Sequence, residues 1–230
     1  MESSQSLTPF TSDAATLLPS EPSLDDAGSQ EALDLMLQAR EKFAEGIALF
    51  SDEDWDLKKD KDNVKLWTKK SEEGGANLFR REASLDQSAE AVSAWLSDQQ
   101  NLVDNNDKLK SSEIICELNE QALLIRREMK GNMIVSNRDL ALFWNKVDLT
   151  DGSIAHVMFS IEHDSIPKTK CVRAEADINL LILQPVSDTS CVLLNIGKMD
   201  PKGSIPTSFV NKMVTKQYDD LVKIKKLVEA

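Results

Sequence analysis

The chain has 230 residues, of which 41% are hydrophobic, and carries a formal net charge of −12 at pH 7. This length suits one domain of about 180 residues with its own core, preceded by a tail. A negative charge this large repels nucleic-acid backbones and argues against a nucleic-acid partner. The three cysteines, Cys116, Cys171 and Cys191, are scattered and odd in number, which predicts buried free thiols in a reducing compartment.

The N-terminal sequence shows no targeting signal. The first ten residues, MESSQSLTPF, have neither the basic nor the apolar region of a secretory signal peptide, and no run of 18 apolar residues occurs in the chain. We therefore expect a cytoplasmic protein. Residues 1–28 are rich in Ser, Thr, Pro and acidic residues, which predicts a disordered tail before a folded domain at residues 29–230.

The folded part begins with a predicted helix at residues 30–50, where apolar side chains recur every three or four positions and Ser29 suits the N-cap. A hairpin follows, with strands at 55–57 and 64–67 and a polar turn, KDKDN, between them. ANLFRREASL alternates as a third strand, with the odd-numbered side chains from Phe79 to Leu85 on one side. DQSAEAVSAWLSD then predicts a short helix.

Six further strands are predicted in the second half, at residues 112–118, 122–129, 138–147, 153–161, 171–183 and 191–199. The strand at 171–183 alternates most cleanly. Its even-numbered residues from Val172 to Ile182 are apolar and share one predicted face, whereas Arg173, Glu175 and Asp177 share the other. A slip of one residue would exchange these faces, so the register is strongly specified.

The chain closes with a predicted helix that begins at Pro206 and carries an apolar stripe as far as Val228. The element order is therefore helix, three strands, short helices, six strands and long helix. A predominantly antiparallel sheet of about nine strands curves strongly, and a long helix with one apolar face is a natural cover for its concave side. The predicted fold class is α+β.

Catalytic and metal-binding patterns are scarce. The sequence has no GxSxG motif and no Gly-rich phosphate loop. His156 and His163 lie seven residues apart, so on one strand they would point to opposite faces and could not share a zinc ion. We therefore expect no catalytic residue, no metal and no cofactor.

Three segments resemble, in order and spacing, the StAR-related lipid-transfer (START) domains: VSNRDLALFW, SIEHDSIPKTKCVRAE and MDPKGSIPTSFVNKMV. In that family a strand opens with an Arg-Asp pair, here Arg138-Asp139. A later strand ends in a Ser–x–x–His segment, here Ser160 and His163. The last strand leads through Asp, Gly and Pro, here in MDPKGSIP, into the C-terminal helix. The resemblance covers residues 31–230.

The resemblance implies a helix-grip fold, in which the sheet wraps around the C-terminal helix and leaves a tunnel for one lipid. Members of the family bind sterols, phospholipids, ceramide or related amphipaths and move them between membranes without covalent chemistry. The chain would then be a non-enzymatic lipid carrier that acts as a monomer, with a lipid ligand and transient membrane contact. A closed apolar cavity of this kind agrees with the scarcity of catalytic patterns.

Sterol-type members carry a buried acid–arginine pair inside the tunnel. Their arginine position corresponds to Trp144 here, and their acidic position to Leu124 or a close neighbour. The resemblance therefore argues against that type of sterol recognition and leaves an elongated or more apolar ligand open. A register shifted by one residue would place Arg126 or Arg127 in the pocket, where either could pair with a phosphate head group. The tunnel-lining residues implied in this way are Leu124, Arg126, Leu140, Leu142, Trp144, Met213 and Val214.

The charged residues near the Arg-Asp pair have plainer interpretations. Arg138 and Asp139 would form a salt-bridged strand start that fixes the preceding turn. Arg173 would join Glu175 and Asp177 in a charge network at the surface.

Two alternative functions stay open. An enzyme that acts on a bulky apolar substrate in the same cavity would need a polar cluster there, for which Glu113, Glu128 and His156 are the candidates. A lipid-sensing regulatory module would instead use lipid binding to stabilise the fold and the acidic tail to contact a partner.

Overall fold

The computed structural model describes residues 13–72, 75–132 and 135–230. The strands of these residues are β1 (Asp56–Lys61), β2 (Val64–Lys69), β3 (Leu78–Leu85), β4 (Leu109–Asn119), β5 (Ala122–Met129), β6 (Arg138–Asp148), β7 (Ile154–Ser160), β8 (Val172–Arg173), β9 (Glu175–Ser187) and β10 (Ser190–Asp200). The helices are α1 (Ala14–Leu17), α2 (Leu24–Ala27), α3 (Gln30–Ser51), α4 (Ala89–Ser97), α5 (Gln99–Asn105), α6 (Thr207–Thr215) and α7 (Gln217–Val228). The predicted α+β class is confirmed.

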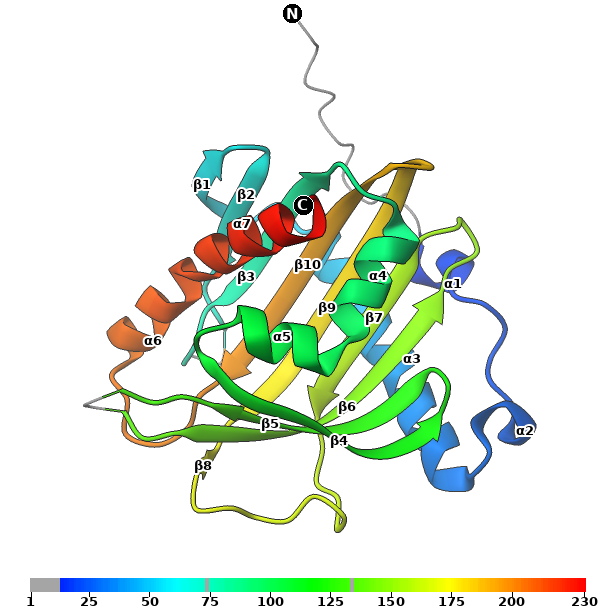
Figure 1. Ribbon diagram of the computed structural model, residues 1–230, viewed down its shortest axis with the longest axis horizontal. Coiled ribbons are helices and arrows are strands. Elements are labelled where there is room, and N and C mark those ends of the chain that lie inside the picture. Colours follow the sequence, from blue (N-terminus) through cyan, green and yellow to red (C-terminus); the bar gives the residue numbers. More distant parts are fainter. Residues whose placement is uncertain (1–12, 73–74, 133–134) are drawn as a thin grey trace, which may run out of the picture.

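One curved antiparallel sheet contains the strands in the order β1-β2-β3-β10-β9-β7-β6-β5-β4, and β8 pairs in parallel with the start of β6. Helices cover both of its faces (Figure 1). α3 runs along the convex face, behind the strands in Figure 1, and contacts β6, β7, β9 and β10. α4, α5, α6 and α7 lie on the concave face in front, and α7 crosses β2 and β3.

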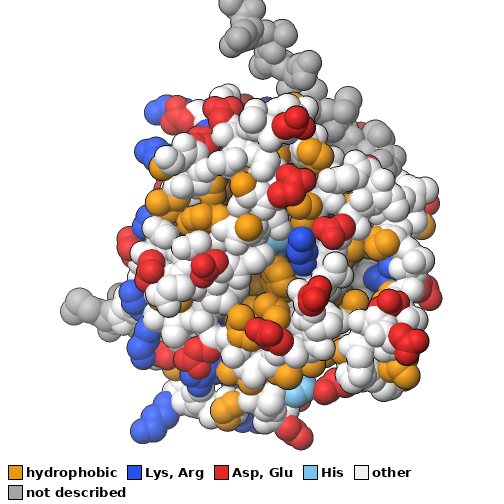
Figure 2. Space-filling view, turned by 45° about the vertical axis from the view of Figure 1, so that its right-hand side comes forward, with side chains coloured by type: hydrophobic (Ala, Val, Ile, Leu, Met, Phe, Trp, Pro, Cys, Tyr) orange, Lys and Arg blue, Asp and Glu red, His pale blue; other side chains and the backbone are white. Residues whose placement is uncertain are grey.

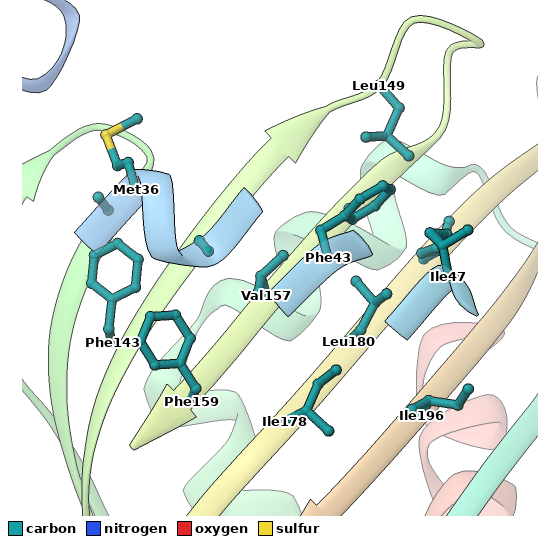
Figure 3. Packing of buried hydrophobic residues seen from close by; sticks show 14 of the residues in the cluster. Met36, Phe43, Ile47, Phe143, Leu149, Val157, Phe159, Ile178, Leu180 and Ile196 are labelled. Carbon is teal, nitrogen blue, oxygen red and sulfur yellow. The ribbon is translucent and has the colours of Figure 1, made fainter. Parts of the chain in front are cut away.

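A hydrophobic core fills the space between the convex face of the sheet and α3 (Figure 3). Ser29 caps α3 by accepting a hydrogen bond from the Ala32 amide at 3.1 Å. Gly46 allows a close approach of the helix to the sheet, because a Cβ at this position would lie 2.4 Å from Cδ2 of Leu180. Buried side chains of the sheet fill the space beneath the helix: Phe143, Val157, Phe159, Ile178, Leu180 and Ile196.

β9 changes face along its length. Its register with β10 shifts between Lys198 and Met199, which leaves Asp177 as an extra residue in a β-bulge. The apolar residues after the bulge, Ile178, Leu180 and Ile182, pack under α3, while those before it, Ala174 and Ala176, lie on the concave side. The prediction that all even-numbered residues of this strand share one face is therefore wrong. Asp177 itself stays at the surface and pairs with Lys42 at 3.0 Å and with Lys198 at 3.3 Å.

The predicted single C-terminal helix is divided in two. α6 ends at Thr215, α7 begins at Gln217, and Lys216 lies between them. The hydroxyl of Tyr218 donates to the carbonyl oxygen of Lys61 at 2.9 Å, so a tertiary contact holds the first turn of α7 next to the β1–β2 hairpin. None of the helices in the described ranges combines the length and the hydropathy that crossing a membrane requires.

Residues 13–28, which the sequence predicts to be disordered, form the short helices α1 and α2. Leu17 and Ala27 are 3% and 0% exposed and belong to the core that α3 covers. Ser23 and Asp26 cap α2 reciprocally, and the Thr150 amide donates to the carbonyl oxygen of Leu17 at 2.9 Å. This part of the predicted tail is thus docked on the domain. Residues 1–12, the rest of it, lie outside the described residues.

The three cysteines are free thiols, as predicted. Cys191 is buried, and burial raises the pKa of its thiol to about 11, which keeps it protonated and unreactive at neutral pH. Cys116 and Cys171 are only half-buried, so the prediction of burial holds for Cys191 and not for these two.

Candidate functional site

The concave face holds a cavity of about 610 Å³, within the range of small-molecule sites. Central strands supply its floor, which includes Arg127 of β5, Trp144 of β6, Met158 of β7 and Leu181 of β9. α6 and α7 supply its roof through Val210, Met213, Val214, Gln217 and Ile224. Figure 2 views this side of the molecule obliquely and shows hydrophobic side chains across the middle of the surface, with acidic ones among and around them.

A polar network crosses the part of the floor that β3, β10 and β9 form. Nε and Nη2 of Arg81 donate to Oδ1 of Asn195 at 2.9 and 2.5 Å, and Nδ2 of Asn195 donates to Oδ1 of Asn179 at 2.7 Å. Nη1 of Arg81 donates to the carbonyl oxygen of Gln217 at 3.1 Å, which ties β3 to the start of α7. Burial lowers the pKa of Arg81 to about 10, against the opposing effect of the Asp220 charge, so the guanidinium is charged at pH 7.

Arg127 enters the floor from β5. Its Nε donates to Oγ of Ser112 and its Nη2 to Oε1 of Gln99, both at 3.1 Å. Its Nη1 lies 3.5 Å from the sulfur of Met158. All three partners are uncharged. Burial lowers the pKa of Arg127 to about 10, so this guanidinium is also charged at pH 7.

His156 is the titratable residue that β7 places at the cavity. Its Nε2 is hydrogen-bonded to Oγ of Ser93 in α4 at 2.8 Å, and its ring meets Trp144 edge-on with the centroids 5.1 Å apart. Burial, and to a lesser extent the charge of Lys146, lowers the pKa of His156 to about 3, so the imidazole is neutral at pH 7. Across the described residues, no group of three or more His, Cys, Asp or Glu side chains could hold a metal ion.

The buried imidazole makes the fold sensitive to acid. His156 takes up a proton near pH 6.5 in the unfolded chain but only near pH 3 in the folded one, so its contribution to stability is complete above pH 6.5 and is lost as the pH falls. Between pH 7 and pH 4 this effect should remove about 3 kcal/mol from the free energy of unfolding. Urea unfolding at both pH values should therefore show a smaller loss, by about 3 kcal/mol, for His156→Gln than for the wild type. Equal losses would contradict this role of the histidine.

Arg138 and Asp139, the pair that opens β6, point to opposite sides. Arg138 lies at the rim of the cavity and donates to the carbonyl oxygens of Pro201 and Lys202 at 3.1 and 3.2 Å. Asp139 is 1% exposed and accepts two hydrogen bonds from Arg173, at 3.0 and 2.9 Å. The strand start is thus salt-bridged, but through Arg173. The prediction that Arg173 belongs to a surface network with the acidic residues of its own strand is wrong, because β8 pairs with β6 and sets Arg173 opposite Asp139.

Five of the seven predicted lining residues lie on the concave side. Trp144, Met213 and Val214 line the cavity itself. Leu140 and Leu142 share the face of Trp144 and form a buried cluster with it next to the cavity. Leu140, Leu142 and Trp144, which the sequence placed together at the tunnel, thus lie on the same face of β6.

Leu124 and Arg126 lie on the opposite face. Leu124 packs in the core beneath α3, and Arg126 forms an ion pair with Glu113 at 2.8 Å. Arg127 pairs with Leu140 across the two strands, so the odd-numbered residues of β5 are the ones that face the concave side. The expected places of Leu124 and Arg126 were wrong by one residue, and the alternative residue, Arg127, is the one at the cavity.

The polar residues Arg81, Asn179 and Asn195 of the floor were not predicted from the sequence. For Arg81 a signal was present, since the odd-numbered positions of β3 place it on a face that is otherwise apolar. A charged residue within an apolar stripe needs a polar partner, and this need points to a network or a ligand. Asn195, within the apolar run CVLLNIG, carried the same signal.

The START-domain family model matches residues 36–227 of the chain. The chain belongs to the START-domain family. Three solved structures share its helix-grip fold: human StAR-related lipid transfer protein 5 (TM-score 0.75, 18% identity, 84% of this chain and 95% of that one), human STARD10 (0.72, 18%, 90% and 80%) and a STAR-related lipid transfer protein from Xanthomonas axonopodis (0.69, 22%, 77% and 100%). The resemblance inferred from three short segments is confirmed.

Curated relatives of this START domain include two proteins named ceramide transfer protein, one from Xenopus tropicalis and one from Xenopus laevis. Each is 21% identical to the chain over an alignment of 197 positions, which covers 75% of this chain and 31% of the relative. The chain therefore spans about a third of the length of these relatives.

Proposed function

We propose that this START domain binds a single lipid in the cavity of the concave face and carries it between membranes without covalent chemistry. The observation that supports this most strongly is the cavity of about 610 Å³ between a curved sheet and two amphipathic C-terminal helices, in a chain of this family. A lipid chain held there, between the sheet and the two helices, would lose much of its contact with water. The carrier would act as a cytoplasmic monomer that touches membranes only transiently.

The size of the cavity is consistent with one amphipath. At about 30 Å³ per water molecule, it has room for on the order of 20 water-sized groups. Burial of about 400 Å² of apolar ligand surface would contribute about 10 kcal/mol before the costs of ordering and association. That is enough to hold a lipid in water and still release it when the cavity opens.

The positions of the polar residues that an enzyme would need also favour a binding role. Of the three candidates for a catalytic cluster, only His156 lines the cavity, and its partner there is the hydroxyl of Ser93. Glu113 pairs with Arg126 on the opposite face. Glu128 accepts hydrogen bonds from Lys110 and Asn137, at 2.9 and 2.8 Å. The polar residues of the floor serve instead to orient a bound head group.

Sterols, phospholipids and ceramide are the candidate cargoes, the last also because of the names of the Xenopus relatives. Trp144 pairs with Leu123 across β5 and β6, at the place where the family resemblance puts the acid–arginine pair of sterol-type members. Two apolar side chains there disfavour that mode of sterol recognition. A lipid with an extended apolar chain fits this wall better.

Exchange of the lipid requires the roof to move. The break at Lys216 divides the roof into α6 and α7, and Met213 on α6 is 38% exposed. We propose that α6 contacts the membrane and swings about this break, while the contacts of Arg81 and Tyr218 keep the start of α7 on the sheet.

Lipid capture from vesicles tests the proposed function. The purified protein is incubated with liposomes of mixed natural lipids, separated from them and weighed by native mass spectrometry. We expect one lipid per chain, and we expect the loaded protein to deliver it to acceptor liposomes. A protein that stays empty in every mixture would contradict the proposal.

A further inference from the structure

We propose that the bound lipid carries a negative charge at its polar end, as a phosphate monoester or a carboxylate, and that Arg127 binds this charge. This ligand class presupposes the lipid-binding function proposed above. It goes further in naming the head-group chemistry and the residue that recognises it.

Arg127 is held from behind by a fixed, uncharged frame. In the described part of the chain, Arg127 is one of the residues that line the cavity, but its two acceptors, Ser112 and Gln99, are not. The two acceptors are themselves linked, since the hydroxyl of Ser112 donates to Oε1 of Gln99 at 2.6 Å. The Gln99 amide group is fixed in turn by its hydrogen bond to the carbonyl oxygen of Ser97, at 2.8 Å. A guanidinium has five N–H groups, so the frame orients Arg127 and leaves donors for a ligand in the cavity.

Among the residues that the structure describes, the guanidinium of Arg127 has no counter-ion. Its hydrogen-bond partners in the described part of the chain are a hydroxyl, an amide oxygen and a thioether, none of them charged. Burial alone accounts for the lowered pKa of this group, with no charged neighbour among the causes. A buried cation without an opposite charge is costly, and a ligand anion in hydrogen-bond contact would offset that cost.

The cavity is basic although the chain is acidic. Among the described residues that line it, two are acidic and six are basic, in a chain of net charge −12. Both acidic residues have partners: Asp220 accepts two hydrogen bonds from Lys108 at 2.8 Å, and Asp107 lies 3.7 Å from the amine of Lys223. The six basic residues are Arg81, Lys108, Arg127, Lys130, Arg138 and Lys216. This concentration of positive charge favours an anion over a neutral or cationic head group.

Two nearby arginines have other roles. Arg81 uses its donors to hold Asn195 and the carbonyl oxygen of Gln217, so it connects β3, β10 and α7. Arg126 donates to both carboxylate oxygens of Glu113, at 2.9 and 2.8 Å. Arg127 therefore has the placement and the unneutralised charge that an anion site requires.

Competition between matched lipids tests the inference. The protein is incubated with phosphatidylcholine vesicles that contain a small, equal fraction of phosphatidic acid, oleate or oleyl alcohol, and the captured lipid is quantified by mass spectrometry. We expect phosphatidic acid or oleate to be enriched over phosphatidylcholine and oleyl alcohol. Arg127→Gln should lower the affinity for the anionic lipid about 10- to 100-fold, the usual effect of losing a charge-assisted hydrogen bond, and so abolish the preference for anionic over neutral lipid.

Arg126→Gln is the matched control, because it removes the adjacent arginine from the opposite face and should keep the wild-type preference. Thermal melting without lipid shows whether each variant folds, and Arg127→Lys, which keeps the charge, should retain the preference for anions. Capture of lipid without that preference, or equal losses in Arg126→Gln and Arg127→Gln, would overturn the inference and leave the carrier function standing. No capture of any lipid would instead contradict the carrier function.

If glycerol phosphate raised the melting temperature as much as phosphatidic acid does, the ligand would be a free phosphate ester, and the lipid head-group assignment would be wrong.

Discussion

Replacement of Phe143 by alanine should lower the free energy of unfolding by about 3–5 kcal/mol, the usual cost of removing a fully buried phenylalanine. Phe143 is 0% exposed and packs beneath α3, with its ring centroid 5.4 Å from that of Phe159. The closed packing on this side leaves little room for neighbours to fill the space, so a cavity would remain. Urea denaturation measures the change.

Leu181→Ala is the matched control on the concave face. Leu181 is half-buried and borders the existing cavity, so its truncation should cost only about 1–2 kcal/mol, less than a fully buried leucine would. The contrast between the two variants tests whether one face of the sheet is a closed core and the other a binding site. Comparable losses in both would contradict this division.

A tryptophan in place of Leu181 should have the largest effect on lipid binding. The added ring would project into the cavity and leave the stability of the lipid-free protein nearly unchanged. With a lipid bound, the same ring would overpack the site at a cost of about 1–3 kcal/mol, which corresponds to a roughly 5- to 150-fold weaker affinity. Titration with a fluorescent lipid, together with unfolding of the lipid-free protein, separates the two effects.

Leu57→Trp provides the control for the added indole. Leu57 is 49% exposed on β1 and does not belong to the described cavity lining, so this variant should bind lipid as the wild type does. Leu181→Trp with wild-type affinity would mean that the lipid lies elsewhere.

The sequence was most informative where local rules and tertiary packing agree. The apolar run after Arg138-Asp139 alternates along β6, and its even-numbered residues lie on the concave face as predicted. The two faces of this strand meet different surroundings, α3 on one side and the cavity on the other, and apolar side chains suit both. This explains why a charged pair precedes so continuous an apolar run: the pair joins neighbouring segments while the run is buried on both sides.

Prediction failed where one inserted residue reverses which side chains, odd-numbered or even-numbered, lie on a given face of the sheet. The even-numbered apolar residues of β9 form one continuous stripe in the sequence. The bulge at Asp177 places the first part of this stripe on one face of the sheet and the rest on the other. The predicted positions of Leu124 and Arg126 were wrong for a related reason. The register of β5 is set by its pairing with β6 and not by its own sequence pattern. A bulge and a register depend on the partner strand, which the local sequence does not contain.

Composition also misled at the N-terminus. Residues 13–28 are polar on average, but two of them, Leu17 and Ala27, reach the core, and the caps of α1 and α2 are formed within the segment. The average composition of a segment does not reveal a few apolar residues that are buried in the core. The break between α6 and α7 was equally hidden, because the apolar stripe runs through it without interruption.

The most direct test of a lipid in this cavity is photo-cross-linking with a lipid that carries a photoreactive group in its acyl chain, followed by peptide mapping. We predict cross-links on β7 and β9, around Met158 and Leu181, and on α6 and α7 around Val214. Leu181→Trp should suppress these cross-links and Leu57→Trp should not. Cross-links confined to α3 and the outer surface, or unaffected by Leu181→Trp, would contradict a lipid site between the sheet and the C-terminal helices.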